Sequence, residues 1–101
     1  MSDFDNYLSK EEVERLAILA EEASEVVKIV GKILRHGYAS HDPFDPQRVS
    51  NRGLLAQEIG DLDWIISLMQ DEADFPEGVR LQRKHLKAES AKPYLHHQDA
   101  K

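Results

Sequence analysis

The chain has 101 residues, of which 41% are hydrophobic and 32% are charged, as is typical of one folded domain with a modest core. Its formal net charge of −6 argues against a partner that is a nucleic-acid polymer, and the absence of cysteine excludes disulfides and thiolate metal sites. No secretory apolar region follows Met1 and no apolar run approaches membrane-spanning length, so we expect a cytoplasmic protein without a membrane partner.

A long helix is predicted over residues 10–35. Ser9 and Glu12 form a Ser-x-x-Glu capping box ahead of a periodic apolar run, and Gly37 is typical of the position just past a helix end. One of two apolar stripes on this helix is close to a heptad seam, and it consists of Val13, Leu16, Ala20, Ala23, Val27, Val30 and Leu34. A helix that is apolar on two sides needs more cover than a three-helix monomer provides. We therefore predict a homo-oligomer.

Residues 37–50 read GYASHDPFDPQRVS and are predicted to form a loop, because two prolines and several turn formers break both periodicities. Loops of this length inside a compact domain often carry function. Tyr38 and Phe44 can stack on a base while Arg48 contacts a phosphate. The alternative is that the aromatic residues only anchor the loop to the helices.

A second helix is predicted over residues 52–71, capped by Ser50 or Asn51. Its apolar residues cover more than half of the circumference, which is typical of a core helix. With no strand pattern elsewhere, the sequence indicates an all-α fold. We expect a bundle of three to four helices that is completed by oligomerisation.

A third helix is predicted over residues 76–91, because Pro76 suits a first helical turn. Its apolar stripe is weak, and its distinctive residues are the basic Arg80, Lys84 and Lys87 on one face. These cations either form solvated surface or lie near the phosphates of a ligand. Residues 9–91 are the expected core of the single domain 1–101, and residues 92–101 are a polar tail.

Two acid pairs stand out by their position on the helices. Glu22 and Glu25 are three residues apart, as are Glu58 and Asp61, so each pair projects from one helical face. With 19 acidic residues many such pairs arise by chance, but these two interrupt apolar stripes. The apolar residues that flank them are Ile18, Ile29, Leu54, Ile65 and Leu68. Because carboxylates within a core-facing stripe are costly unless they are paired or bind a metal, both pairs predict a cation.

Four carboxylates are hard oxygen ligands, which suit Mg²⁺, with Mn²⁺ also possible. A di-iron site on facing helices requires Glu-x-x-His pairs, and the sequence contains none. No phosphate-binding glycine loop or nucleophile motif occurs either. The sequence thus favours metal-assisted attack by water, in which one of the carboxylates can instead serve as the general base.

The motif Glu21-Glu22-Ala-Ser-Glu25, followed by Glu58-Ile-Gly-Asp61, resembles the Glu-Glu-x-x-Glu and Glu-x-x-Asp signature of the MazG-like, all-α nucleoside triphosphate pyrophosphohydrolases. The resemblance covers roughly residues 9–91. It implies a helical bundle that assembles as dimers or tetramers around Mg²⁺ sites. It also implies cleavage of (d)NTPs to (d)NMP and pyrophosphate, often as housecleaning of the nucleotide pool.

Carried over by position, the resemblance makes Glu22, Glu25, Glu58 and Asp61 the Mg²⁺ ligands and catalytic acids. Lys28 and Lys32 lie one and two turns beyond Glu25, where the family often has a substrate-binding lysine. Lys87 resembles a phosphate-contacting position of the third helix, although Ser90 stands where a second lysine is expected. The spacing between the motif halves is long, which we attribute to the loop 37–50.

Two other functions are compatible with the same residues. One is a non-enzymatic dimerisation or regulatory module that keeps the bundle without the chemistry. The other is a different Mg²⁺-dependent phosphohydrolase on the same scaffold. The sequence does not identify the preferred base.

Overall fold

The computed structural model describes residues 5–98, and within them the chain is all-α, as predicted. It consists of α1 (Lys10–His36), α2 (Asn51–Asp71), α3 (Glu77–Ser90) and the short 3₁₀ helix η1 (Lys92–Tyr94). The only β-type pairing in this range is an isolated antiparallel bridge between His41 and Ser50. Each predicted α-helix is confirmed to within one residue at either end. Of the predicted polar tail, residues 99–101 lie outside the described part of the chain.

The helix ends follow from local side chains. Ser9 Oγ accepts a hydrogen bond from the Glu12 N–H at 3.0 Å, and Glu12 Oε1 accepts one from the Ser9 N–H at 2.8 Å, so the predicted capping box is confirmed. Ser50 Oγ accepts a hydrogen bond from the Gly53 N–H at 3.1 Å and caps α2. Gly37 ends α1 with φ 88° and ψ 166°, a conformation that strongly favours glycine.

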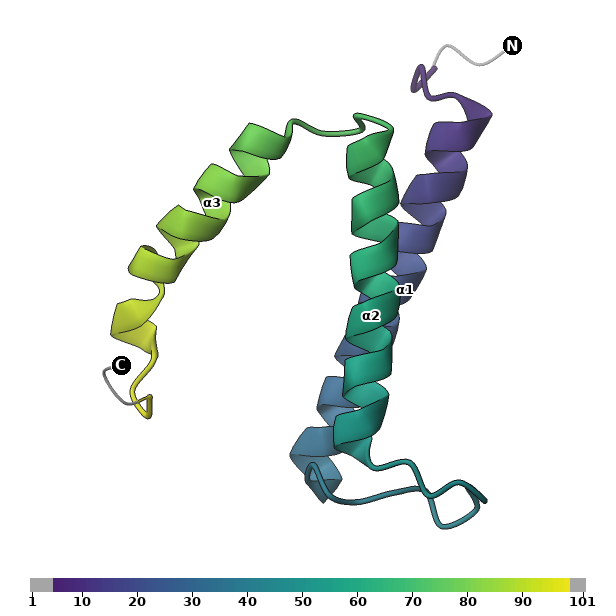
Figure 1. Cartoon of the computed structure of the whole chain (residues 1–101), viewed down its shortest axis with the longest axis vertical. Helices are drawn as coiled ribbons and strands as arrows, with labels where there is room; N and C mark the ends of the chain where they lie inside the picture. Colours follow the sequence, from purple (N-terminus) through teal and green to yellow (C-terminus); the bar gives the residue numbers. More distant parts are fainter. Residues whose placement is uncertain (1–4, 99–101) are drawn as a thin grey trace.

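The two long helices run antiparallel and side by side as a hairpin (Figure 1). Its buried apolar side chains are Ile29 from α1 with Ile65 and Met69 from α2, and Ile65 is fully enclosed. The α1 stripe that carries Glu22 and Glu25 faces α2, because Ile18, Ile29 and Ile33 in it are buried or half-buried. Every member of the predicted heptad seam, Val13 through Leu34, is exposed instead.

The loop between α1 and α2 is irregular, as predicted, and is held by its own side chains. The Asp45 carboxylate accepts hydrogen bonds from the Gln47 and Val49 N–H groups at 2.9 and 3.0 Å, which hold the pKa of Asp45 below its usual value. The Arg52 guanidinium lies 4.4 Å from the centre of the Tyr38 ring. Tyr38 therefore anchors the loop to α2.

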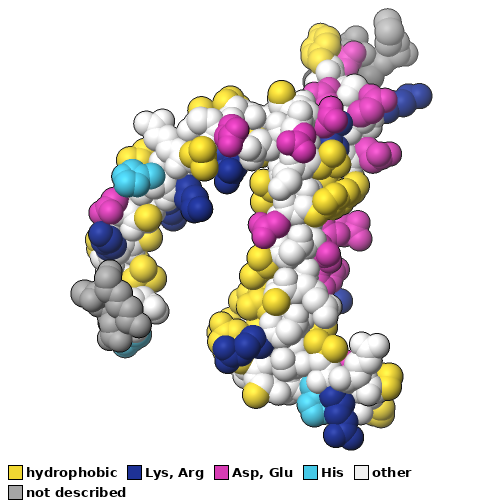
Figure 2. Space-filling model, in the orientation of Figure 1, with side chains coloured by type: hydrophobic (Ala, Val, Ile, Leu, Met, Phe, Trp, Pro, Cys, Tyr) yellow, Lys and Arg dark blue, Asp and Glu magenta, His cyan; other side chains and the backbone are white. Residues whose placement is uncertain are grey.

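The third helix leaves the hairpin at the end opposite this loop and stands apart from α2 (Figures 1 and 2). None of its residues is buried. At its base Asp74 forms a two-pronged ion pair with Arg15 of α1, with Nε–Oδ2 and Nη2–Oδ1 distances of 2.6 and 2.8 Å. One chain alone thus forms a helical hairpin with a separate helix rather than a closed bundle.

Hydrophobic side chains remain visible over the surface of the hairpin (Figure 2). Val27 is 71% exposed and Leu34 is 82% exposed, both on the seam of α1. None of the helices among residues 5–98 is long and apolar enough to cross a membrane.

Candidate metal centre

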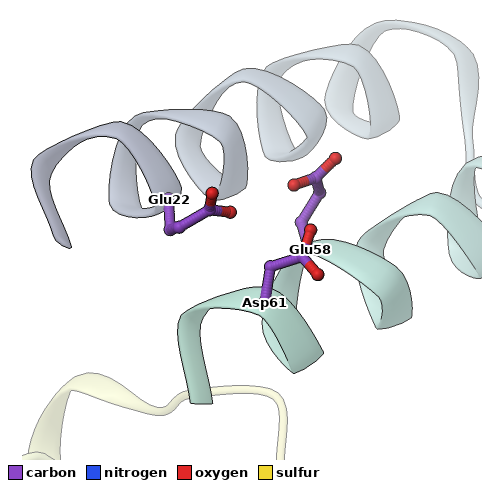
Figure 3. A group of neighbouring side chains, drawn as sticks. All are labelled: Glu22, Glu58 and Asp61. Carbon is purple, nitrogen blue, oxygen red and sulfur yellow. The ribbon is translucent and has the colours of Figure 1, made fainter. Parts of the chain in front are cut away.

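Three of the four predicted acids converge between α1 and α2. Glu22 points from α1 toward Glu58 and Asp61, which project from neighbouring turns of α2 (Figure 3). Each of the three offers one carboxylate oxygen, and these oxygens all lie within 4.8 Å of one another. The three-residue spacing of Glu58 and Asp61 puts both on one face of α2, and their carboxylates reach that of Glu22 on α1. We call Glu22, Glu58 and Asp61 the acid trio.

The acid trio lies at the edge of the hairpin interface. Glu22 and Glu58 are half-buried, and Asp61 is exposed. Partial burial raises the pKa of Glu22 above its usual value, and it is raised further by the charges of Asp61, Glu21, Glu58 and Glu25. Like charges thus gather here, and no basic side chain of residues 5–98 forms an ion pair with them, which is the electrostatic setting that a cation relieves.

Glu25, the fourth predicted ligand, lies one turn beyond Glu22 on α1 and is half-buried. It is not part of the acid trio. Instead Glu25 lines a cavity of about 220 Å³ next to the acid trio. Glu58 belongs to the acid trio and also lines this cavity. A role for Glu25 as a metal ligand stays a prediction.

This neighbouring cavity, which we call the lysine cavity, is rich in cations. Lys28, Lys32 and Arg35 line it, together with Glu25, Glu58 and two apolar side chains. Two of the predicted substrate-binding residues, Lys28 and Lys32, therefore lie beside the acids. Arg35 is a further basic residue of this cavity, beyond the predicted substrate-binding residues. Its spacing of three residues from Lys32 and seven from Lys28, on one helical face, is the signal that identifies it.

The other predicted substrate contacts lie elsewhere. Arg48 is in the loop, with a positive φ of 52°, and does not line the lysine cavity. Lys84 and Lys87 are exposed on α3, which stands away from the hairpin. Their contact with a substrate stays a prediction.

The donor set fits a hard divalent cation. Three carboxylates on two helices can supply oxygen ligands to Mg²⁺ or Mn²⁺, and water or phosphate oxygens can complete the coordination sphere. Neither histidine nor cysteine belongs to the group, so it lacks the ligands that zinc prefers. The arrangement places this candidate cation site next to a cavity lined by three basic side chains, and Glu58 belongs to both.

No protein family, curated protein or solved structure that we compared with this chain matches it.

Proposed function

We propose that this protein is a Mg²⁺-dependent, MazG-like nucleoside triphosphate pyrophosphohydrolase that converts (d)NTP to (d)NMP and pyrophosphate. The observation that carries the proposal is the contact between the acid trio and the lysine cavity through Glu58. Carboxylates for a divalent cation and cations for phosphate oxygens are the two needs of a site for metal-bound triphosphates. Removal of unwanted nucleotides is the role that the motif resemblance suggests.

Each group of residues has a distinct task in this proposal. Glu22, Glu58 and Asp61 would hold Mg²⁺, with Mn²⁺ as a substitute. The bound metal would neutralise phosphate charge and make water a better nucleophile. Lys28, Lys32 and Arg35 bind the phosphate chain and orient it, as Arg and Lys do at phosphate sites.

Glu25 is the best-placed general base. It lies one turn from Glu22 and lines the lysine cavity, so its carboxylate borders the space proposed for the phosphates. A carboxylate outside the ligand set keeps its oxygens free to accept the proton of the attacking water. No nucleophilic side chain is needed.

We also propose a homo-oligomer, dimer or tetramer, in which a second copy covers the exposed seam of α1. The seam runs over almost the full length of α1, from Val13 to Leu34, and all of its members are exposed. An apolar stripe of this length with near-heptad spacing is typical of a helix-packing surface.

The activity is tested by pyrophosphate release from a panel of canonical and oxidised (d)NTPs with Mg²⁺. We expect Glu58→Gln and Asp61→Asn each to lower the rate by at least about 100-fold, because a metal that is lost or misplaced forfeits several kcal/mol of charge stabilisation. Circular dichroism and sedimentation should show unchanged helicity and assembly. Asp63→Asn is the matched control, since Asp63 is exposed on α2 and is not in the acid trio.

The product released from the nucleotide distinguishes the proposed function from the two alternatives. Orthophosphate in place of pyrophosphate would favour another Mg²⁺-dependent phosphohydrolase on this scaffold. A wild-type protein that releases neither product from any nucleotide would leave the non-enzymatic dimerisation or regulatory module as the better explanation.

A further inference from the structure

A second cavity, of about 250 Å³, lies at the end of the hairpin where α1 stops and α2 starts. Lys32 and His36 of α1, His41 and Asp42 of the loop, and Asn51 of α2 line it. We call it the loop cavity. Lys32 also lines the lysine cavity, so the two adjoin. The loop cavity is smaller than the ~300–1,000 Å³ of sites that enclose a whole drug-sized ligand, and it suits one ring system of a larger ligand.

Asn51 is the unusual member of this lining. It is only 2% exposed, and its Nδ2 donates a hydrogen bond to the Gly37 carbonyl at 3.1 Å. This bond fixes the orientation of the side-chain amide. Its Oδ1 is buried and has no hydrogen-bond partner within the described part of the chain. A buried acceptor without a donor is costly, so an N–H or O–H group from a ligand or a water stabilises this oxygen.

The group that would pair with Asn51 Oδ1 is a hydrogen-bond donor, and a phosphate is not one. The first N–H groups of α2 are already used, since Asn51 donates to the Ser40 carbonyl, Arg52 to the Tyr38 carbonyl and Gly53 to Ser50 Oγ. The helix start therefore offers no free amide to an anion. Asp42 adds a second acceptor, because one of its carboxylate oxygens accepts the Phe44 N–H at 2.9 Å and the other remains available.

We infer that the loop cavity is the base-recognition site of the nucleotide substrate and that it favours bases with an exocyclic amine. The inference rests on the proposed function. An amine carries two N–H donors, which match Asn51 Oδ1 and the Asp42 carboxylate, while the imidazole rings of His36 and His41 offer flat faces for a base.

The positions along the hairpin agree with this assignment. Seven residues, about 10 Å of helix, separate Asn51 from Glu58 on α2, and the same number separates Lys32 from Glu25 on α1. A sugar and the first phosphates bridge this interval between the loop cavity and the acid trio. Because Oδ1 is enclosed, the amine reaches it only when neighbouring side chains move aside.

The test compares nucleotide pairs that differ at the amine: GTP with ITP, ATP with ITP, and CTP with UTP. In at least one pair we expect the amine-bearing nucleotide to have a KM about tenfold or more below that of its counterpart, because the counterpart leaves a buried acceptor unpaired. Asn51→Ala should abolish this preference, because it removes the acceptor that pairs with the amine. Gln47→Ala, an exposed loop change outside both cavities, should keep it.

Asn51 also anchors Gly37, so Asn51→Ala can unfold the chain, which circular dichroism would reveal. Asp42→Asn is then decisive, since it keeps an oxygen for the Phe44 N–H but replaces the free oxygen with a donor. The same loss of preference is expected from it. Equal KM values in all three pairs, with pyrophosphate released, would overturn the inference alone. Release of pyrophosphate from none of the nucleotides would overturn the proposed function, and the inference with it.

Discussion

Charge repulsion in the acid trio makes the hairpin responsive to divalent cations. The raised pKa of Glu22 shows that its ionised form is disfavoured where it stands, by partial burial and by the acids around it. A cation bound only by the folded state stabilises that state by mass action. We therefore expect millimolar Mg²⁺ or Mn²⁺ to raise the melting temperature of the wild-type protein and a chelator to reverse the change.

Glu22→Gln should change both the melting temperature without metal and its rise on addition of Mg²⁺. Removing one charge relieves the repulsion, so the metal-free variant should melt above the metal-free wild type, whereas added Mg²⁺ should raise its melting temperature less. The measurement is a set of thermal melts with and without Mg²⁺, with Glu14→Gln, an exposed change elsewhere on α1, as the control. A wild-type melting curve that Mg²⁺ does not move would contradict the metal site.

Gly37 is the residue whose backbone the fold constrains most. Its φ of 88° with ψ of 166° is nearly restricted to glycine, and a Cβ added there would meet no atom within 4 Å. The cost of Gly37→Ala is therefore backbone strain alone, and we expect the free energy of unfolding to fall by about 1–3 kcal/mol. Gly78→Ala, also without a close neighbour but inside α3, should leave stability unchanged or raise it slightly. Urea denaturation of both variants checks the contrast.

Among the elements, the junction of α2 and α3 is fixed to α1 by the ion pair of Arg15 and Asp74. Both side chains are mostly buried, at 14% and 12% exposed. Hydrogen bonds from the Arg15 guanidinium hold the pKa of Asp74 below its usual value of 3.8. A carboxylate whose pKa is lowered by folding contributes stability that is present above its unfolded-state pKa and is lost as pH falls through the folded one.

We accordingly expect part of the acid unfolding below about pH 4 to belong to this pair. Asp74→Asn should lower stability at neutral pH, because it leaves a mostly buried guanidinium without its counter-charge. In the acid range it should make stability depend less steeply on pH. Glu89→Gln breaks only an exposed pair with Lys92 and should change little. Urea midpoints measured across the acid range test this, and identical acid limbs for wild type and Asp74→Asn would refute it.

For the whole molecule, the decisive surface is the exposed seam of α1. Val27, at its centre, is 71% exposed although it lies on a stripe of near-heptad spacing. If a second copy covers the seam, Val27→Asp buries a charge in the interface and should convert the oligomer to monomers. Val79→Asp, at a 62% exposed site on α3, is the matched control and should leave the assembly intact. Sedimentation velocity distinguishes the outcomes, and a monomeric wild type would contradict the proposed oligomer.

The sequence by itself determined the three helices and their ends. The helix ends depend on contacts within a few residues, made by Ser9 with Glu12, by Ser50 and by Gly37. Their effects can therefore be predicted from the sequence. The same locality placed Glu58 beside Asp61 on one face of α2, because helical periodicity fixes which residues share a face. It also placed Lys28 and Lys32 on the turns beyond Glu25.

Only the tertiary structure decided which faces meet. Residues 10–35 present two apolar stripes, and periodicity cannot tell which one packs against α2. The hairpin buries the stripe with the acids and leaves the heptad seam exposed, which brings Glu22 to the α2 acids and leaves Glu25 beside the lysine cavity. The unpaired Oδ1 of Asn51 likewise depends on where the loop returns to α2. These contacts join segments that are far apart in the chain. Helical periodicity shows which residues share a face of one helix, but not which other segment packs against that face.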